Sequence, residues 1–151
     1  MTNPEIALTC ALIAAVLFAF ALFFIHRYRK KHPAMDDLEG HDFEYYCADL
    51  LKANGFRDVE VTRGSGDFGA DILCAKGGVT YAVQCKCYDD AVGVIAVQEI
   101  YAGRDWYDCM VGAVMTNQYF TEPAKRMAEK RHILLWDRDV VENMDRNRTG
   151  N

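Results

Sequence analysis

The chain has 151 residues, of which 51% are hydrophobic and 26% charged, and its formal net charge at pH 7 is −5. This composition excludes wholesale disorder, collagen and a disulfide-rich scaffold, and the length allows one compact domain. The six cysteines form no Cys-x-x-Cys pair and mostly lie in apolar runs. We interpret them as buried and reduced rather than as zinc ligands or disulfides, which fits a cytosolic domain.

An apolar segment near the N-terminus is the first predicted element. The twenty residues from Ile6 to Ile25 carry no charge, and a helix of that length spans the roughly 30 Å hydrocarbon core of a bilayer. Basic residues follow it, at Arg27 and from Arg29 to Lys31, whereas Glu5 and the α-amino group precede it. By the positive-inside rule, the sequence predicts a single-pass membrane protein with its N-terminus outside and its C-terminal domain in the cytoplasm, as at a bacterial inner membrane.

Two other uses of this segment are weaker. A cleaved signal peptide needs basic residues before a shorter apolar stretch and a small-residue cleavage site after it, and neither is present. The basic cluster could bind nucleic acid, but orientation in the membrane and anionic headgroups account for it. The chain then divides into an anchor with its basic flank at 1–32, a linker at 33–39, a main domain at 40–144 and a polar tail at 145–151.

The elements expected after the linker follow the order αβββαβαβ, which is typical of a mixed α/β sandwich. Residues 40–54 have helical spacing of apolar side chains and end with Asn54-Gly55 as a C-cap. Further helices are expected at 94–106 and at 121–131, the latter opened by Thr121 and Pro123, with a short helical tail near the end. Strands are expected at 58–62, 70–75, 79–88, 110–115 and 133–136, with a hairpin turn at 76–78.

Polar side chains on the second and third strands carry the candidate chemistry. Because side chains alternate along a strand, Gln84 and Lys86 lie on one side of the third strand, and the hairpin can bring Asp71 beside them. A hard cation such as Mg²⁺ could be held by the Asp71 carboxylate, the Gln84 side-chain oxygen and the Cys85 backbone carbonyl. Lys86 could then favour hydroxide formation or stabilise the transition state, and Glu44 offers a second carboxylate through a water.

Each of these residues also has an ordinary structural explanation. Asp71 could cap a turn at a strand end, Lys86 could be a solvated strand lysine, and Glu44 could be a helix-surface acid. The face shared by Asp71, Gln84 and Lys86 favours the functional interpretation. The glycines between Gly64 and Gly69 could cradle a phosphate, but a turn that needs positive φ is their commoner use.

The motifs in this region resemble those of a known family. The matching residues are Gly40-x-x-Phe43-Glu44 with Leu50-Leu51 and Gly55-Phe56, then Gly66-Asp67-Phe68-Gly69-Ala70-Asp71-Ile72, then Val83-Gln84-Cys85-Lys86. They are similar to the Mrr-type restriction endonuclease domain of the PD-(D/E)XK nuclease superfamily, from about Leu38 to Trp136. The resemblance implies an αβββαβ core with a mixed central sheet flanked by helices, cleavage dependent on Mg²⁺ or Mn²⁺, and active-site positions at Glu44, Asp71, Gln84 and Lys86, with glutamine replacing the usual second acid.

The charge of the main domain bears on DNA binding. After Lys31 the chain holds 13 of its 17 Lys and Arg residues but 21 of its 22 Asp and Glu residues, a net charge of −8. Backbone binders usually neutralise phosphates with a basic surface, so we expect modest, salt-dependent affinity. The candidate contacts are Arg63 and Ser65 in the glycine-rich turn and Gln98 on the second helix, and a homodimer could pool two weak surfaces.

Three functions remain open from the sequence. The leading hypothesis is a membrane-anchored, Mg²⁺-dependent endonuclease that hydrolyses phosphodiester bonds of double-stranded DNA, with restriction of foreign DNA as its expected role. The alternative is a catalytically inactive module that binds or senses nucleic acid on the same fold. A third hypothesis, a scaffold for other membrane proteins, predicts neither DNA binding nor metal dependence.

Overall fold

The computed structural model describes residues 13–20, 35–62 and 68–149, and the chain divides into the units Met1–Ala34 and Met35–Asn151. In the first unit, residues 13–20 are helical, and their large apolar side chains are exposed. The helices of the described ranges include none that is both long and apolar enough to cross a membrane. Ile6 and Ile25, the ends of the predicted span, lie outside the described residues, so the span stays a prediction.

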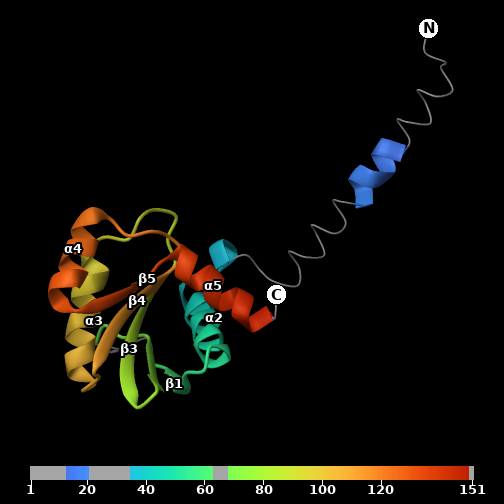
Figure 1. Cartoon of the computed structure of the whole chain (residues 1–151). Helices are drawn as coiled ribbons and strands as arrows, with labels where there is room; N and C mark the ends of the chain where they lie inside the picture. The colour runs from blue at the N-terminus through green and yellow to red at the C-terminus, as the bar shows by residue number, and fades with distance from the viewer. Residues whose placement is uncertain (1–12, 21–34, 63–67, 150–151) are drawn as a thin grey trace, which may run out of the picture. The chain divides into compact units, whose positions relative to one another are not determined.

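The second unit is built around one five-stranded sheet (Figure 1). Its elements are η1 (Met35–Asp37), α2 (Gly40–Ala53), β1 (Arg57–Val61), β2 (Ile72–Lys76), β3 (Val79–Lys86), α3 (Val94–Trp106), β4 (Val111–Thr116), α4 (Glu122–Arg131), β5 (Ile133–Trp136) and α5 (Arg138–Thr149). The strand order is β1-β2-β3-β4-β5, antiparallel from β1 to β3 and parallel from β3 to β5. The expected mixed α/β fold and its order of elements are confirmed.

The local signals that predicted the helix ends are present in the structure. The Thr121 hydroxyl accepts a hydrogen bond from the Ala124 N–H at the start of α4, with a proline in the first turn. At the end of α2, the Asn54 side-chain amide donates to the Leu50 carbonyl, and Gly55 takes a φ of 85°. These groups satisfy backbone donors and acceptors that a helix end leaves unpaired, so each helix ends where its sequence signal lies.

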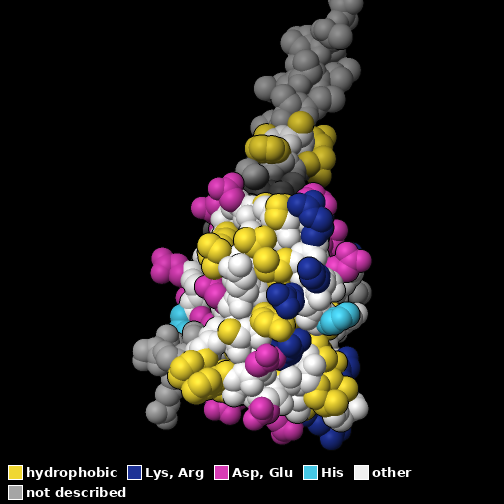
Figure 2. Space-filling model, turned by 90° about the vertical axis from the view of Figure 1, so that its left-hand side faces the viewer, with side chains coloured by type: hydrophobic (Ala, Val, Ile, Leu, Met, Phe, Trp, Pro, Cys, Tyr) yellow, Lys and Arg dark blue, Asp and Glu magenta, His cyan; other side chains and the backbone are white. Residues whose placement is uncertain are grey.

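Helices α3 and α4 cover one face of the sheet, and Figure 2 looks onto that side of the molecule. Lys and Arg side chains spread down this face between apolar ones. Those on α4 that are exposed are Lys125, Arg126, Lys130 and Arg131. The guanidinium groups of Arg104 and Arg131 both lie over the ring of Tyr101, each 4.9 Å from its centre. Basic side chains are thus frequent here although the domain is acidic as a whole.

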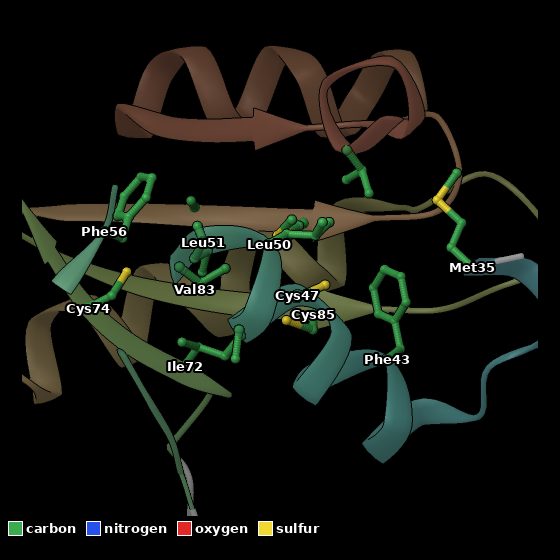
Figure 3. Close-up of a cluster of buried hydrophobic side chains, with 14 residues drawn as sticks. Met35, Phe43, Cys47, Leu50, Leu51, Phe56, Ile72, Cys74, Val83 and Cys85 are labelled. Atoms are coloured by element: carbon green, nitrogen blue, oxygen red, sulfur yellow. The ribbon is translucent and has the colours of Figure 1, made fainter. Parts of the chain in front are cut away.

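Helices α2 and α5 lie on the other face, over the core shown in Figure 3. The α2 residues Phe43, Cys47, Leu50 and Leu51 lie on one side of the helix and are fully buried. They pack against side chains of the three central strands, among them Ile72, Cys74, Val83, Cys85 and Ala113. All five cysteines of the described ranges are free thiols, as the sequence predicted. Alternate residues of β3 therefore face α2, whereas Gln84 and Lys86 belong to the α3 side.

The core extends into segments that the sequence analysis placed outside the domain. Met35 is buried, and Leu38 packs beside it against the same cluster, although both fall in the expected linker. Helix α5 continues to Thr149 and so includes part of the expected polar tail. The domain thus begins before residue 40 with apolar residues of the expected linker, and its last helix runs past residue 144.

Two glycines let the chain before β2 run directly against α3. A side chain at Gly69 would collide with the Glu99 carbonyl, and a Cβ at Gly103 would lie 2.8 Å from the Gly69 carbonyl group. Gly69 also has a φ of 89°, which a residue with a side chain rarely adopts. This contact holds the segment that leads to Asp71 against the middle of α3.

We expect the substitution Gly103→Ala to destabilise the domain, because the new methyl group would collide with the backbone carbonyl of Gly69. Overpacking of this kind costs about 1–3 kcal/mol, partly offset by the better helix propensity of alanine. Thermal unfolding of the full chain followed by circular dichroism should show a midpoint lower by roughly 5 °C. Gly40→Ala, where nothing lies within 4 Å of the added Cβ, is the matched control and should not lower the midpoint.

Candidate active site

The Asp71 carboxylate lies just before β2 and binds the neighbouring strand β3. Its Oδ2 atom accepts hydrogen bonds from Nε2 of Gln84 and, at 2.6 Å, from the backbone N–H of Cys85. The strand register explains this placement, because Ile72 pairs with Val83 and the Asp71 N–H donates to the Val83 carbonyl. Asp71 and Gln84 are both buried. The structure thus brings together two of the side chains that the sequence analysis placed in one site.

The oxygen atoms around Asp71 fit a divalent cation. Gln84 binds Asp71 through its amide nitrogen, and this bond does not engage the amide oxygen. The N–H and C=O of one strand residue point toward the same neighbour, so the Cys85 carbonyl faces the side of β3 where Asp71 lies. Carboxylate, amide and carbonyl oxygens are the ligands that Mg²⁺ and Mn²⁺ prefer. The described ranges contain no group of three His, Cys, Asp or Glu side chains that could hold a metal, so a cation here needs the amide and backbone oxygens.

Lys86 follows Gln84 by two residues on β3, and its ammonium group pairs with the carboxylate of Glu99 on α3. Its Nζ atom is 2.8 Å from Oε2 of Glu99, and 18% of the Lys86 side chain is exposed. Burial lowers the pKa of Lys86, but the contact with Glu99 and the charge of Asp71 outweigh it and raise the pKa above its usual value. Lys86 is therefore a cation at neutral pH, within electrostatic reach of Asp71.

Glu99 is the functional candidate that the sequence analysis missed. The sequence pointed to Gln98 on the same helix, but in the structure Gln98 is exposed and Glu99 contacts Lys86. The helical phase contained the signal. At 100° per residue, Glu99 borders the buried stripe that includes Val97 and Ile100, whereas Gln98 lies nearly opposite that stripe. A polar residue at the border of a buried stripe is the one that can reach a strand side chain.

Glu44 lies on α2, on the other face of the sheet. Its carboxylate accepts a hydrogen bond from Nδ1 of the exposed His41 at 2.8 Å, and 19% of the Glu44 side chain is exposed. The pKa of the buried Cys85 thiol is raised by a hydrogen bond with Cys47, by burial, and by the negative charges of Asp71 and Glu44. Glu44 is thus within electrostatic reach of Cys85, as Asp71 is, while its hydrogen bond is to His41.

The predicted DNA contacts are described only in part. Arg63 and Ser65 lie outside the described residues, and Gln98 is exposed on the outer side of α3. A hollow of about 470 Å³ lies beside the residues that follow Lys86 in the sequence. It is lined by Asp36, Leu38, Cys87, Tyr88, Asp89 and Asp90. Its acidic lining does not suit a phosphate, so the hollow adds no DNA contact to those predicted from the sequence.

Known structures with the same fold were found, at low sequence identity. A crystal structure of the protein of unknown function AF1548 has a TM-score of 0.53 and 19% identity, over 68% of this chain and 66% of that one. The DNA modification-dependent restriction endonuclease AspBHI has a TM-score of 0.55 and 20% identity, over 84% of this chain and 34% of that one. The MspJI restriction endonuclease, in complex with a 27-mer oligonucleotide, has a TM-score of 0.55 and 16% identity, over 85% of this chain and 31% of that one.

The two restriction endonucleases are much longer than this chain, which spans about a third of each. No curated protein matches the chain. A model of the restriction endonuclease family Mrr_cat matches residues 35–144, which covers both strands of the candidate site and the three helices α2, α3 and α4. The chain therefore belongs to the Mrr_cat restriction endonuclease family, and residues 35–144 are a nuclease domain of that type.

Proposed function

We propose that this protein is a membrane-anchored endonuclease that hydrolyses double-stranded DNA with Mg²⁺ or Mn²⁺ and serves to restrict foreign DNA. The observation that carries the proposal is the arrangement at β2 and β3, where a buried carboxylate binds Gln84 and lies within electrostatic reach of the Lys86 ammonium. Metal-dependent phosphodiester hydrolysis uses these three kinds of group. The oligonucleotide in the MspJI complex supports DNA as the ligand.

The residues of the site divide the work of hydrolysis between them. Asp71, the Gln84 amide oxygen and the Cys85 carbonyl would hold the cation, which when bound makes a water more acidic and offsets phosphate charge. The Lys86 ammonium stabilises the negative charge that develops on the phosphate oxygens. Glu99 holds Lys86 in its protonated form and limits the directions in which it can point. Glu44 supplies a second acid at the α2 side, through a water.

An inactive DNA-binding or sensing module is the second candidate. It is favoured by Gln84, a neutral amide where the superfamily usually has a second acid, because a neutral ligand holds a divalent cation less strongly than a carboxylate does. Duplex binding that survives Asp71→Ala, without cleavage by the unmodified chain, would favour this candidate. A homodimer is part of either proposal, because two copies would pool the weak DNA affinity expected from a net charge of −8 after Lys31.

Lys86→Ala should reduce the cleavage of supercoiled plasmid in Mg²⁺ by at least about a hundredfold, because it removes the cation that stabilises the transition state. EDTA should abolish cleavage by the unmodified chain. Lys52→Ala is the matched control, since Lys52 is an exposed α2 lysine in a surface ion pair with Asp49. Equal cleavage by the Lys86→Ala variant and the unmodified chain would contradict the proposed site.

Glu99→Gln should lower kcat on the order of tenfold and leave KM nearly unchanged, because the loss of a charge-assisted contact lets Lys86 leave its position. The effect is moderate because 39% of the Glu99 side chain is exposed. Steady-state cleavage of a short labelled duplex measures both constants. Glu129→Gln, on an exposed part of α4, is the control. A raised KM with unchanged kcat would show that Glu99 contributes to DNA binding instead.

We further propose that residues 6–25 anchor the chain in a bilayer with the nuclease domain in the cytoplasm. The exposed apolar side chains of residues 13–20 support this, because such a surface is stable in lipid and costly in water. The full chain should remain in the membrane pellet after alkaline carbonate extraction and be released by detergent. Release by carbonate alone would refute the anchor and leave the nuclease proposal intact.

A further inference from the structure

We propose that Phe68 and Trp106 form an aromatic platform that stacks against a base of bound DNA beside the cleavage site. The inference rests on the proposed function, because it assumes that DNA is held at Asp71 and Lys86. It adds a base contact to the phosphate chemistry of the site. We refer to Phe68 and Trp106 together as the aromatic platform.

The two rings stack on one another and yet remain largely exposed. Their centres are 3.8 Å apart with an angle of 19° between the planes. Phe68 is 51% exposed and Trp106 is 60% exposed. The pair joins residues 38 positions apart in the chain, one from the segment before β2 and one from the last turn of α3. In such a stack each ring covers one face of the other, so the outer face and the edge of a ring are what a base can contact.

The backbone at Phe68 adopts an unfavourable conformation, and the Phe68 side chain is too exposed for its burial to offset the cost. Phe68 has a φ of 49°, a left-handed conformation that costs a bulky residue roughly 1–2 kcal/mol. The following residue, Gly69, packs its backbone onto the Glu99 carbonyl of α3, which fixes the segment in place. The contact between Gly69 and α3 therefore holds the exposed Phe68 ring on Trp106. Backbone strain at a residue with an exposed side chain indicates contact with a ligand rather than core packing.

The aromatic platform lies close to the candidate catalytic groups. Phe68 precedes Asp71 by three residues, and Trp106 follows Glu99 by seven. Residues seven apart lie on the same side of a helix and are about 10 Å apart along its axis. That length corresponds to about three base pairs of duplex at 3.4 Å each. A phosphodiester bound at Asp71 and Lys86 would therefore bring nearby bases to the platform.

Charge makes an uncharged contact more important in this domain than in a basic one. The chain after Lys31 carries a net charge of −8, so counterion release from phosphates supplies less affinity than usual. A base that stacks on an aromatic ring contributes by its π-face whatever its sequence. Aromatic and apolar side chains can also enter between two bases of a duplex and unstack them. The platform thus provides DNA affinity that depends little on salt.

The test uses the full chain with Lys86→Ala, so that binding can be measured without cleavage. Phe68→Ala and Trp106→Ala should each weaken the binding of a fluorescein-labelled duplex on the order of tenfold. The factor should be the same at low and at high salt, because stacking is not electrostatic. Phe68→Tyr and Trp106→Phe should restore most of the affinity, which separates loss of the ring from loss of the fold. Leu134→Ala, at another exposed apolar residue, is the matched control.

Unchanged affinity in the two alanine variants would overturn the platform, and so would a loss that disappears at high salt. A change of oligomeric state with unchanged DNA affinity would identify the platform as a contact between copies and would overturn the proposal as well. These failures differ from failure of the proposed function. In that case the chain with native Lys86 neither cleaves nor binds DNA, whatever residues occupy positions 68 and 106.

Discussion

The hydrogen bonds that the Asp71 carboxylate accepts from β3 are the interaction on which the candidate active site depends. Asp71 lies one residue before the start of β2. Its side-chain carboxylate accepts the hydrogen bond from the Cys85 N–H and also holds the Gln84 side-chain amide. A buried carboxylate is costly unless donors meet it, and both donors flank the oxygens that suit a cation. The Asp71 side chain therefore pairs a backbone N–H of β3 and holds the Gln84 side chain in position. Lys86, on the same strand, is then placed by the alternation of side chains.

Most of the fold could be predicted because its signals are local. Periodic apolar residues on α2, the cap at Thr121 and the glycine turn between β2 and β3 each specify a short segment without reference to the rest. The part of the site on β2 and β3 shares this property. Asp71 and Gln84 lie on the two arms of one hairpin, so alternation and a short turn suffice to place them together.

The remaining features depend on tertiary packing, which a sequence pattern specifies poorly. Glu99 reaches Lys86 only because α3 crosses β3 at a particular rotation, and a difference of one residue separates it from Gln98. Met35 packs into the core through contacts with distant parts of the chain. Its neighbours in the sequence are mostly polar, so the local pattern gave no sign of this role. The stacking of Phe68 on Trp106 likewise needs the close approach that Gly69 and Gly103 allow.

The position of the candidate site residues Asp71 and Gln84 near one hairpin has a consequence for how the protein folds. The contact between Asp71 and Gln84 spans only 13 positions, so it closes a short loop at a small cost in chain entropy. Contacts of this kind form early in folding, before strands that need long crossovers are added. The Asp71 carboxylate and the Gln84 amide can therefore meet while β4 and β5 are still unpaired. Glu99 and Trp106 join only when α3 docks, so the ion pair with Lys86 and the stacking on Phe68 form after the contact between Asp71 and Gln84.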